Sequence, residues 1–269
     1  MTRQTIFITG AASGIGWATA IQFHERGWFV GAVDIDEAGL ERLSAELSGD
    51  CFTACLDVTD KAAFDGVIEE FAVAAGDRLD ILFNNAGIAV FGLLAEVPYE
   101  KVLATININL VGVFNGIHAA LPLLQKTPNA LCFSTASSAA SFGVPGMAAY
   151  SATKVAVKGL TEAMSVELAR YGARAADVSP GIIDTPLWSE GKRYTKGGQK
   201  AVRNLPALNR ERSDAARTLP AEAVAACVWD AYQGDKVHWY VPEEAVERDR
   251  AKAMNPEQLR DELIDNNRR

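Results

Sequence analysis

Short runs of apolar residues alternate along the chain with longer segments in which apolar positions recur every three or four residues. The apolar runs have the length of strands and lie at Gln4–Thr9, Trp28–Asp34, Cys51–Leu56, Leu79–Asn84, Ala130–Ser134, Arg174–Ser179 and Val237–Val241. The segments with helical period lie at Gly14–Arg26, Glu37–Leu47, Lys61–Ala75, Tyr99–Gln125, Ala148–Tyr171 and Ala221–Gln233. Continuous apolar strands, each followed by a helix, indicate a parallel sheet that is covered on both faces.

This alternation predicts an α/β protein with a single doubly wound (Rossmann) domain over residues 1–269. We expect a parallel seven-stranded sheet with helices on both faces, and a ligand site beyond the carboxyl ends of the strands. Two segments do not fit this alternation of strands and helices. Pro186–Leu219 is long and polar for a compact domain and is interpreted as a substrate lid. Glu247–Arg269 is strongly charged, and we expect an exposed helix with a frayed end.

Composition narrows the function without defining it. A hydrophobic content of 49% supports a buried core, and the net charge of −8 argues against binding to nucleic acid or to an anionic membrane. No apolar run approaches the roughly 20 residues that a membrane span needs. Four cysteines and three scattered histidines indicate neither a disulfide scaffold nor a metal site. With no signal-peptide pattern at its start, the chain is expected to be cytoplasmic.

The first strand runs into a glycine-rich turn, Thr9-Gly10-Ala11-Ala12-Ser13-Gly14-Ile15-Gly16, where a helix opens. Gly10 permits the tight turn, Gly14 lets the backbone approach a pyrophosphate, and Gly16 lets the helix pack closely on the strand. Helix N–H groups near Ser13 and Ile15 would then face the phosphates. The spacing differs from the commonest dinucleotide fingerprint, and a purely structural turn is the alternative.

Asp34 ends the second strand, about 20 residues beyond the glycine turn, where an acidic group hydrogen-bonds the adenosine ribose of a dinucleotide. Its carboxylate would repel a 2′-phosphate, and neither Ala12 nor Ile35 supplies a cation. The sequence therefore favours NAD over NADP as the cofactor, with an ordinary turn residue as the alternative.

Four further stretches accompany this turn: Asn84-Asn85-Ala86-Gly87, Asn109-Leu110-Val111-Gly112, Ser137 thirteen residues before Tyr150, and Tyr150-Ser151-Ala152-Thr153-Lys154. Together with the glycine turn they resemble the classical branch of the short-chain dehydrogenase/reductase superfamily. The resemblance covers about residues 4–186 and continues weakly beyond them. A Tyr-x-x-x-Lys alone occurs by chance on many helices, whereas five motifs in the right order are specific.

The resemblance implies further cofactor contacts. It assigns the adenine to Asp57 and Val58, the ribose to the loop of Asn85, Ala86 and Gly87, and the nicotinamide to the segment that contains Pro180, Gly181, Ile183 and Thr185. It also implies that Asn84 ties the sheet together.

The chemistry follows from a tyrosine and a lysine one helical turn apart. Hydride transfer from an alcohol needs a base for the hydroxyl proton, and Tyr150 serves if its pKa falls from about 10 toward neutrality. The ammonium of Lys154 favours the phenolate, and Ser137 would polarise the substrate oxygen. Asn109 is the fourth member that the resemblance implies, holding a water that relays protons. The alternatives are a core aromatic for Tyr150, a solvated charge for Lys154, a loop serine for Ser137 and a helix kink for Asn109. Ser134 and Ser138 are the nearest competitors for the role of Ser137, and their spacing from Tyr150 argues against them.

The expected function is therefore hydride transfer between NAD(H) and a small-molecule secondary alcohol or ketone. An NADPH-dependent 3-oxoacyl-carrier reductase is the first alternative, and a catalytically silent nucleotide-sensing protein is the second. The lid carries eight basic residues against the acids Glu190, Glu211 and Asp214, a net +5, so an anionic substrate and a solvated loop both stay open. These basic residues are Lys192, Arg193, Lys196, Lys200, Arg203, Arg210, Arg212 and Arg217.

The end of the chain departs from the family pattern. Many tetrameric members finish with a strand and a glycine-rich Asp-Gly-Gly turn, whereas here His238–Glu243 leads into the charged tail. We therefore expect a homodimer through the long helices Tyr99–Gln125 and Ala148–Tyr171, with a homotetramer as the alternative.

Overall fold

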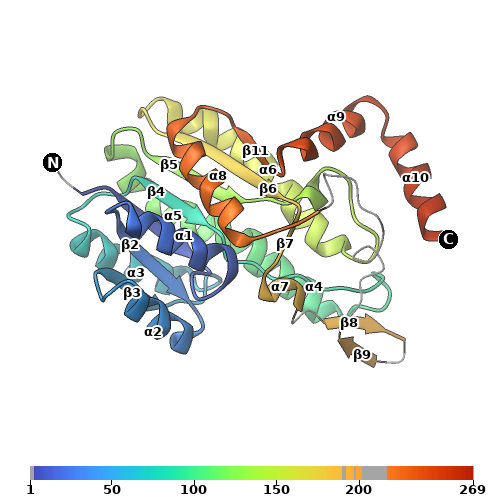
Figure 1. The fold of residues 1–269 in the computed structure, drawn as a ribbon, viewed down its shortest axis with the longest axis horizontal. Helices are drawn as coiled ribbons and strands as arrows, with labels where there is room; N and C mark the ends of the chain where they lie inside the picture. Colours follow the sequence, from blue (N-terminus) through green and yellow to red (C-terminus); the bar gives the residue numbers. More distant parts are fainter. Residues whose placement is uncertain (1–2, 190–191, 197, 202–216, 269) are drawn as a thin grey trace.

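A twisted parallel sheet forms the centre of the molecule (Figure 1). In this computed structural model the described residues are 3–189, 192–196, 198–201 and 217–268. The sheet has seven strands in the order β11-β6-β5-β4-β1-β2-β3, and every pair of neighbours is parallel. The strands are β1 (Thr5–Thr9), β2 (Phe29–Asp34), β3 (Cys51–Cys55), β4 (Ile81–Asn84), β5 (Leu131–Thr135), β6 (Arg174–Pro180) and β11 (His238–Val241). The strand order reverses between β1 and β4, which is where a doubly wound sheet opens a crevice for ligands.

Helices cover both faces of the sheet. They are α1 (Gly14–Glu25), α2 (Glu37–Glu46), α3 (Lys61–Ala74), α4 (Tyr99–Ile106), α5 (Gly112–Lys126), α6 (Ala148–Ala169) and α8 (Ala221–Gln233). The predicted fold class is confirmed, and each predicted strand boundary lies within two residues of the observed one.

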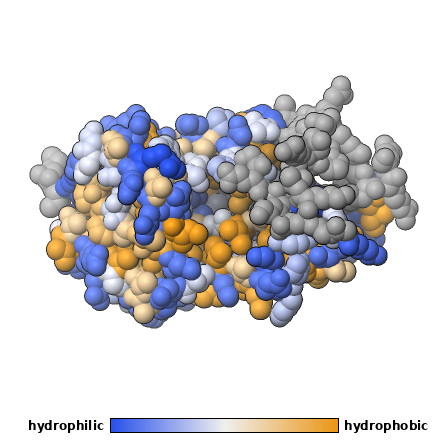
Figure 2. Space-filling view, turned by 90° about the horizontal axis from the view of Figure 1, so that it is seen from below, coloured by the Kyte–Doolittle hydropathy of each residue, from blue (hydrophilic) through white to orange (hydrophobic). Residues whose placement is uncertain are grey.

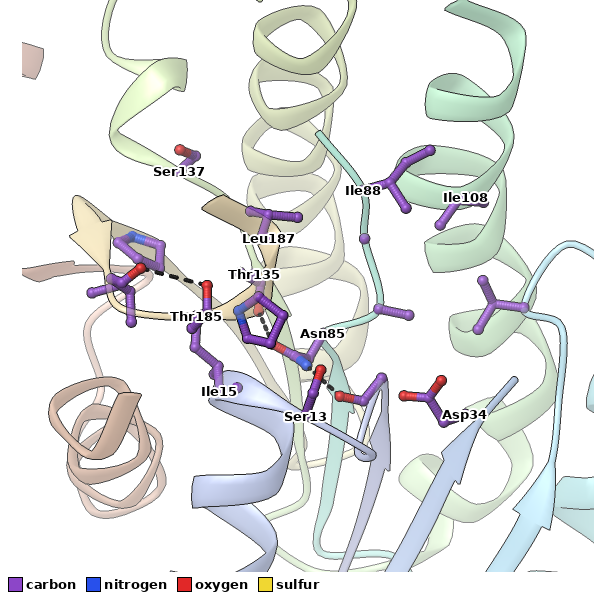
Figure 3. A pocket seen from close by; sticks show the side chains of 18 of the residues that line it. Ser13, Ile15, Asp34, Asn85, Ile88, Ile108, Thr135, Ser137, Thr185 and Leu187 are labelled. Atoms are coloured by element: carbon purple, nitrogen blue, oxygen red, sulfur yellow. Dashed lines mark hydrogen bonds between the residues drawn. The ribbon is translucent and has the colours of Figure 1, made fainter. Parts of the chain in front are cut away.

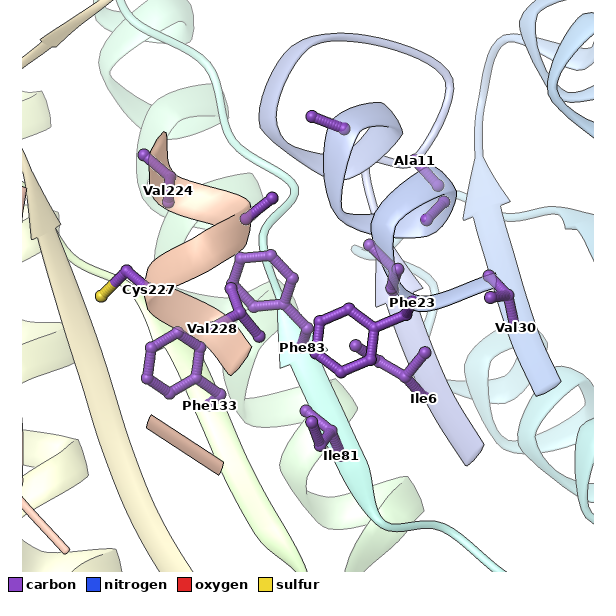
Figure 4. Close-up of a cluster of buried hydrophobic side chains, with 14 of the residues drawn as sticks. Ile6, Ala11, Phe23, Val30, Ile81, Phe83, Phe133, Val224, Cys227 and Val228 are labelled. Atoms are coloured by element: carbon purple, nitrogen blue, oxygen red, sulfur yellow. The ribbon is translucent and has the colours of Figure 1, made fainter. Parts of the chain in front are cut away.

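Two apolar cores lie on opposite faces of the sheet, because successive side chains of a strand point to opposite sides. Ile6 and Ile8 of β1 join the core under α1 and α8, which Figure 4 shows around Phe83 and Val228. Phe7, between them in the sequence, joins the other core, under α3, α5 and α6.

The long helix expected at Tyr99–Gln125 is interrupted. Five residues, Asn107–Val111, form a π-helical turn between α4 and α5. Within the described residues, the stretch Tyr99–Lys126 is also long and apolar enough to cross a membrane, so the expectation that no apolar run reaches that length was wrong. Its Val113, Ile117 and Leu124 pack into the core beside β4, which explains the apolar composition without a membrane.

The predicted lid segment contains short elements that its weak periodicity did not indicate. They are α7 (Pro186–Ser189), the antiparallel strands β8 (Lys192–Thr195) and β9 (Gly198–Ala201), and β10 (Thr218–Leu219), which pairs with β7 (Ile182–Ile183). Figure 1 shows α7 and the β8–β9 hairpin on one side of the sheet. Among the basic residues named for this segment, Arg203, Arg210 and Arg212 lie outside the described residues, as do the acids Glu190, Glu211 and Asp214.

The charged tail forms two helices, α9 (Val246–Met254) and α10 (Pro256–Arg268), separated at Asn255. The tail is helical as expected, but it consists of two helices in place of one, and α9 is not simply exposed. It lies next to α6 and β11, while α10 extends away from the body (Figure 1).

Candidate active site

A cavity of about 410 Å³ opens beyond the carboxyl ends of the central strands. This volume lies within the range of roughly 300–1,000 Å³ that is typical of small-molecule sites. The glycine turn and Asp34 line one part of it, and Ser137, Tyr150 and Lys154 line another. Figure 3 shows this spread, with Asp34 at the end of β2 beside Ser13 and with Ser137 farther along the cavity.

The glycine turn brings the N-terminus of α1 to the cavity. Gly10 has a φ of +68°, and a Cβ on it would lie 2.9 Å from the Ala86 Cα, so a side chain there would be both strained and obstructed. Ser13 precedes α1 without capping it through its side chain, whereas Asp36 and Asp60 accept N–H bonds at the starts of α2 and α3. The first N–H groups of α1 therefore face the cavity side without a side-chain cap, which suits an anionic ligand.

Asp34 has a fixed orientation at the end of β2. Its Oδ2 accepts the Ala12 N–H at 3.0 Å and its Oδ1 accepts the Asp36 N–H at 3.1 Å. Each carboxylate oxygen keeps a second lone pair for a ligand hydroxyl. Ile35 beside it is 70% exposed, and the basic Arg42 on α2 pairs with Asp36 at 3.7 Å.

The Asn85 loop is anchored to β1. The Thr9 Oγ1 accepts the N–H groups of Asn85 and Ala86, each at 3.0 Å. The Asn85 side chain donates to the Thr9 carbonyl at 3.1 Å and accepts from Thr135 Oγ1 at 3.2 Å (Figure 3). These bonds hold the loop along the floor of the cavity.

Asp57 and Val58 lie where the chain leaves β3. The Asp57 Oδ1 accepts from the Thr59 N–H and hydroxyl, which fixes a short turn. The Val58 carbonyl accepts from Asn115 Nδ2 at 2.9 Å, and Val58 fills the space that a side chain on Gly112 would occupy.

Ser137, Tyr150 and Lys154 converge although they come from two elements. Ser137 follows β5 and precedes the 3-10 turn Ser138–Ala140, while Tyr150 and Lys154 lie one turn apart on α6. All three are at least 93% buried. The Lys154 Nζ donates to the Thr135 carbonyl at 2.7 Å and lies 5.6 Å from the centre of the Tyr150 ring.

Burial shifts the pKa values of this pair in opposite directions. It lowers the pKa of Lys154 to about 8, because the ammonium is removed from water. It also raises the pKa of Tyr150, while a hydrogen bond with Ser137 offsets part of that rise. Burial thus opposes ionisation of Tyr150, and the Lys154 ammonium hydrogen-bonds the Thr135 carbonyl, so the fall of the Tyr150 pKa toward neutrality stays a prediction.

Asn109 lies behind the cavity wall, in the π-helical turn. Its Oδ1 accepts the Ile88 N–H at 2.8 Å, and its Nδ2 donates to the Ile88 carbonyl at 2.9 Å and to Thr153 Oγ1 at 3.3 Å. A Cβ on Gly87 would lie 3.3 Å from the Asn109 Oδ1 and 3.6 Å from the Lys154 Nζ. The Asn109 amide and the Lys154 ammonium therefore both lie close to Gly87. The π-helical turn carries this fully buried side chain.

Of the residues singled out from the sequence for this site, all but two line the cavity. Asn109 lies just behind it, and Gly16 is packed beneath, where a Cβ would come within 2.1 Å of the Gly10 carbonyl oxygen. The lining residues are Gly10, Ser13, Gly14, Ile15, Asp34, Asp57, Val58, Asn85, Ala86, Gly87, Ser137, Tyr150, Lys154, Pro180, Gly181, Ile183 and Thr185. Asn84 was expected to tie the sheet together, yet its buried amide has no hydrogen-bond partner among the described residues.

Sequence reasoning missed the apolar part of the cavity. Ile88, Leu187 and Trp188 line it, and Trp188 packs against a small cluster of Phe91, Ala139, Met147 and Tyr150. The Phe91 and Trp188 rings are 5.5 Å apart. Figure 2 shows hydrophobic side chains gathered near the middle of one face, viewed from the side on which α7 lies in Figure 1. A tryptophan just after the Pro180–Thr185 segment was the only sequence signal for this wall.

A family model described as short chain dehydrogenase matches residues 4–195. The chain belongs to the short-chain dehydrogenase/reductase family. Members of this family are oxidoreductases that bind a nicotinamide cofactor.

Known members show how widely substrates vary within the family. This short-chain dehydrogenase/reductase is 38% identical over 202 residues to a 3-oxoacyl-[acyl-carrier-protein] reductase of Thermotoga maritima, covering 74% of this chain and 81% of that protein. It is also 38% identical over 194 residues to an L-2,3-butanediol dehydrogenase of Corynebacterium glutamicum, covering 68% and 73%. A short-chain dehydrogenase/reductase of Burkholderia phymatum, solved in complex with NAD, has a TM-score of 0.80 and 25% identity, over 96% of this chain and 95% of that one.

Proposed function

We propose that this short-chain dehydrogenase/reductase transfers a hydride between NAD(H) and a neutral secondary alcohol or ketone. Asn109, Ser137, Tyr150 and Lys154 are its proposed catalytic group. The observation that carries the proposal is the shared cavity, which brings Ser137, Tyr150 and Lys154 together with the glycine turn and Asp34. Proton transfer and dinucleotide binding would then take place in one continuous space.

The residues around the cavity fit an NAD molecule. The α1 N-terminus, open between Gly10 and Ile15, suits the pyrophosphate, and Asp34 suits the adenosine ribose hydroxyls. The charged residues that line this part of the cavity, Asp34 and Asp57, are both acidic, which opposes the extra phosphate of NADP. The remaining cofactor contacts are proposed for Asp57, Val58, the Asn85–Gly87 loop and the Pro180–Thr185 segment.

The chain's own residues would manage the proton. Oxidation of a secondary alcohol removes the hydroxyl proton together with the carbon-bound hydrogen and its electron pair, and the nicotinamide supplies the acceptor for that hydride. Tyr150 would take the hydroxyl proton while Ser137 holds the substrate oxygen. Lys154, through its charge, would favour the phenolate, and Asn109 would position the path by which the proton leaves.

The apolar wall favours a neutral substrate. Near Tyr150 the cavity is lined by Ile88, Leu187 and Trp188, and Lys154 is the charged lining residue at this part, where its ammonium already donates to Thr135. Arg217, one of the basic residues of the proposed lid, pairs with Glu244 at 3.4 Å. Together these observations support a ketone or alcohol with an apolar group more than an anionic substrate.

Two other functions remain as alternatives with distinct expectations. A 3-oxoacyl-carrier reductase is supported by the similarity to the Thermotoga maritima protein. This alternative was proposed to use NADPH, and the Asp34 carboxylate would repel the 2′-phosphate of that cofactor. A nucleotide-sensing protein would bind the dinucleotide without turnover. The presence of both Tyr150 and Lys154 argues against this alternative, because binding alone does not need the proposed proton-transfer pair. The cytoplasmic location, the role of Pro186–Leu219 as a lid and the homo-oligomeric state stay predictions.

The test is a panel of apolar secondary alcohols, ketones and 3-oxoacyl thioesters, assayed with NAD(H) and NADP(H) by nicotinamide absorbance. We expect turnover of alcohols and ketones with NAD(H) clearly above that with NADP(H). Asp34→Ala combined with Ile35→Arg should narrow or reverse this preference, because the change removes the carboxylate and adds a cation beside the ribose. Equal affinity of the unmodified protein for both dinucleotides would remove the role given to Asp34, and a preference for thioesters would favour the carrier reductase.

A further inference from the structure

One face of α9 is turned toward the body of the protein. Val246, Asp249 and Lys252, three residues apart, are partly buried, whereas the other residues of α9 are exposed. Residues at this spacing lie on the same side of a helix. The charged tail, which sets this chain apart from the family pattern, therefore carries two charged residues on its inward face.

Asp249 is bound to the helix that carries Tyr150 and Lys154. It forms an ion pair with Lys158, which lies on α6 one turn beyond Lys154, and it accepts a hydrogen bond from the Tyr240 hydroxyl of β11. The side chains of Lys158 and Asp249 are only 14% and 19% exposed. Lys158 also donates to the Tyr240 hydroxyl at 3.2 Å. A partly buried pair with a shared third partner is held more firmly than a surface pair.

Lys252, one turn farther along α9, reaches the 3-10 turn that follows Ser137. Its Nζ donates to the Ala140 carbonyl at 3.2 Å. Ala140 ends the 3-10 turn that starts directly after Ser137, and the Ser137 side chain accepts the Ala139 N–H at 3.1 Å within that turn. Ala139 packs in the same cluster as Tyr150. A shift of this turn would therefore move Ser137 relative to Tyr150.

We propose that α9 is a brace that fixes the Ser137 turn against α6, with Asp249 and Lys252 as its positioning residues. Asp249 fastens α9 to α6, and Lys252 extends from α9 to the backbone next to Ser137. Neither Asp249 nor Lys252 is among the described residues that line the cavity. The effect of the brace on catalysis rests on the function proposed above, because it assumes that the Ser137–Tyr150 geometry limits turnover.

Lys252→Met is the sharpest test, since it removes the bond to Ala140 without leaving a buried charge. We expect kcat to fall about 10-fold, because a displacement well below 1 Å at the reacting groups is already costly. The dissociation constant for NAD should change by less than about twofold, since the dinucleotide contacts are elsewhere. Amide hydrogen exchange at Ala139 and Ala140 should become about 10-fold faster. Lys252→Arg, which keeps a donor, should restore both kcat and protection.

Matched controls come from the same helix. Glu247 pairs with Arg250 on the exposed side of α9, so Glu247→Gln removes an ion pair without touching the brace and should leave kcat and exchange unchanged. Asp249→Asn should mimic Lys252→Met, with an added loss of thermal stability from the unpaired Lys158.

The outcomes separate the brace from the proposed function. If Lys252→Met behaves like Glu247→Gln in both kcat and exchange, there is no brace. If exchange rises while kcat stays normal, α9 is a structural strap and not a positioning element. If the unmodified protein turns over no alcohol or ketone, the proposed function fails, and the exchange measurement still decides whether α9 holds the Ser137 turn.

Discussion

At the scale of residues, the Tyr150–Lys154 pair combines two buried titratable groups whose charged forms are both disfavoured. Burial raises the pKa of Tyr150 and lowers that of Lys154 to about 8. A neutral tyrosine is the state that donates a proton to a ketone, so burial favours the form of Tyr150 that reduction needs. Oxidation needs the phenolate, and a cation brought close to the hydroxyl would be required to form it.

Tyr150→Phe tests this assignment most directly. The variant keeps the ring and its packing against Met147 but loses the proton donor, so we expect normal folding and NAD affinity. Turnover should fall by about 100- to 10,000-fold, the usual worth of general acid–base catalysis. Steady-state kinetics on the best substrate of the panel, with NAD binding followed by fluorescence, measures both. Near-normal turnover would mean that another group moves the proton.

The lowered pKa of Lys154 predicts a pH dependence of stability. Its pKa is 10.5 in the unfolded chain and about 8 in the folded protein, so between these values the unfolded chain binds more protons and stability rises with pH. At pH 7 the cost is on the order of 3 kcal/mol, at about 1.4 kcal/mol per pKa unit. Lys154→Met removes this titration, so its gain in stability over the unmodified protein should be largest at pH 7 and shrink toward pH 9.5. Urea unfolding at both pH values gives the difference, and parallel pH profiles would contradict the buried ammonium.

At the scale of elements, the strands and most helices follow from the sequence, because burial on one or both faces imposes a period that the residues display. The glycine turn and Asp34 also follow, since a tight turn and a strand end have local requirements. The π-helical turn at Asn107–Val111 does not, because one extra residue in a turn barely changes the apolar spacing of a long helix. The apolar wall was missed for another reason: Phe91, Met147 and Trp188 meet only in the folded chain.

The last strand is joined to its neighbours by a histidine between two acids. The His238 Nδ1 lies 2.8 Å from the Asp177 Oδ2 of β6, and its Nε2 lies 3.2 Å from the Glu162 Oε1 of α6. The hydrogen bond to Asp177 raises the pKa of His238 above 6.5, against a smaller effect of burial. This contact therefore stabilises the protein fully below pH 6.5 and loses its effect as the pH rises through the folded pKa.

His238→Gln should for this reason destabilise the protein more at pH 6 than at pH 9. At pH 6 the imidazolium pairs with both carboxylates, whereas at pH 9 the neutral ring offers one donor, which a glutamine replaces in part. Midpoints of urea unfolding at the two pH values give the comparison. A loss that is the same at both pH values would show that His238 stays neutral throughout.

At the scale of the whole molecule, the exposed apolar residues concentrate on the helices that were expected to pair. Tyr99, Leu103, Val111 and Phe114 are 39–72% exposed along α4 and α5, and Val155, Val166 and Tyr171 are 39–76% exposed on or just after α6. Such a surface on neighbouring helices is what a two-fold interface buries. The homodimer through these helices stays a prediction, which this apolar surface supports.

Phe114→Glu should therefore separate the subunits. Phe114 is 51% exposed in the single chain, and a carboxylate placed at a two-fold interface would be desolvated beside its symmetry mate. We expect the unmodified protein to sediment as a dimer at micromolar concentration and Phe114→Glu to sediment as a monomer. Val73→Glu is the matched control, because Val73 is 85% exposed on α3, which is not one of the helices expected to pair, and its change should leave the dimer intact. A monomeric unmodified protein, or a dimer that withstands Phe114→Glu but not Val73→Glu, would place the interface elsewhere.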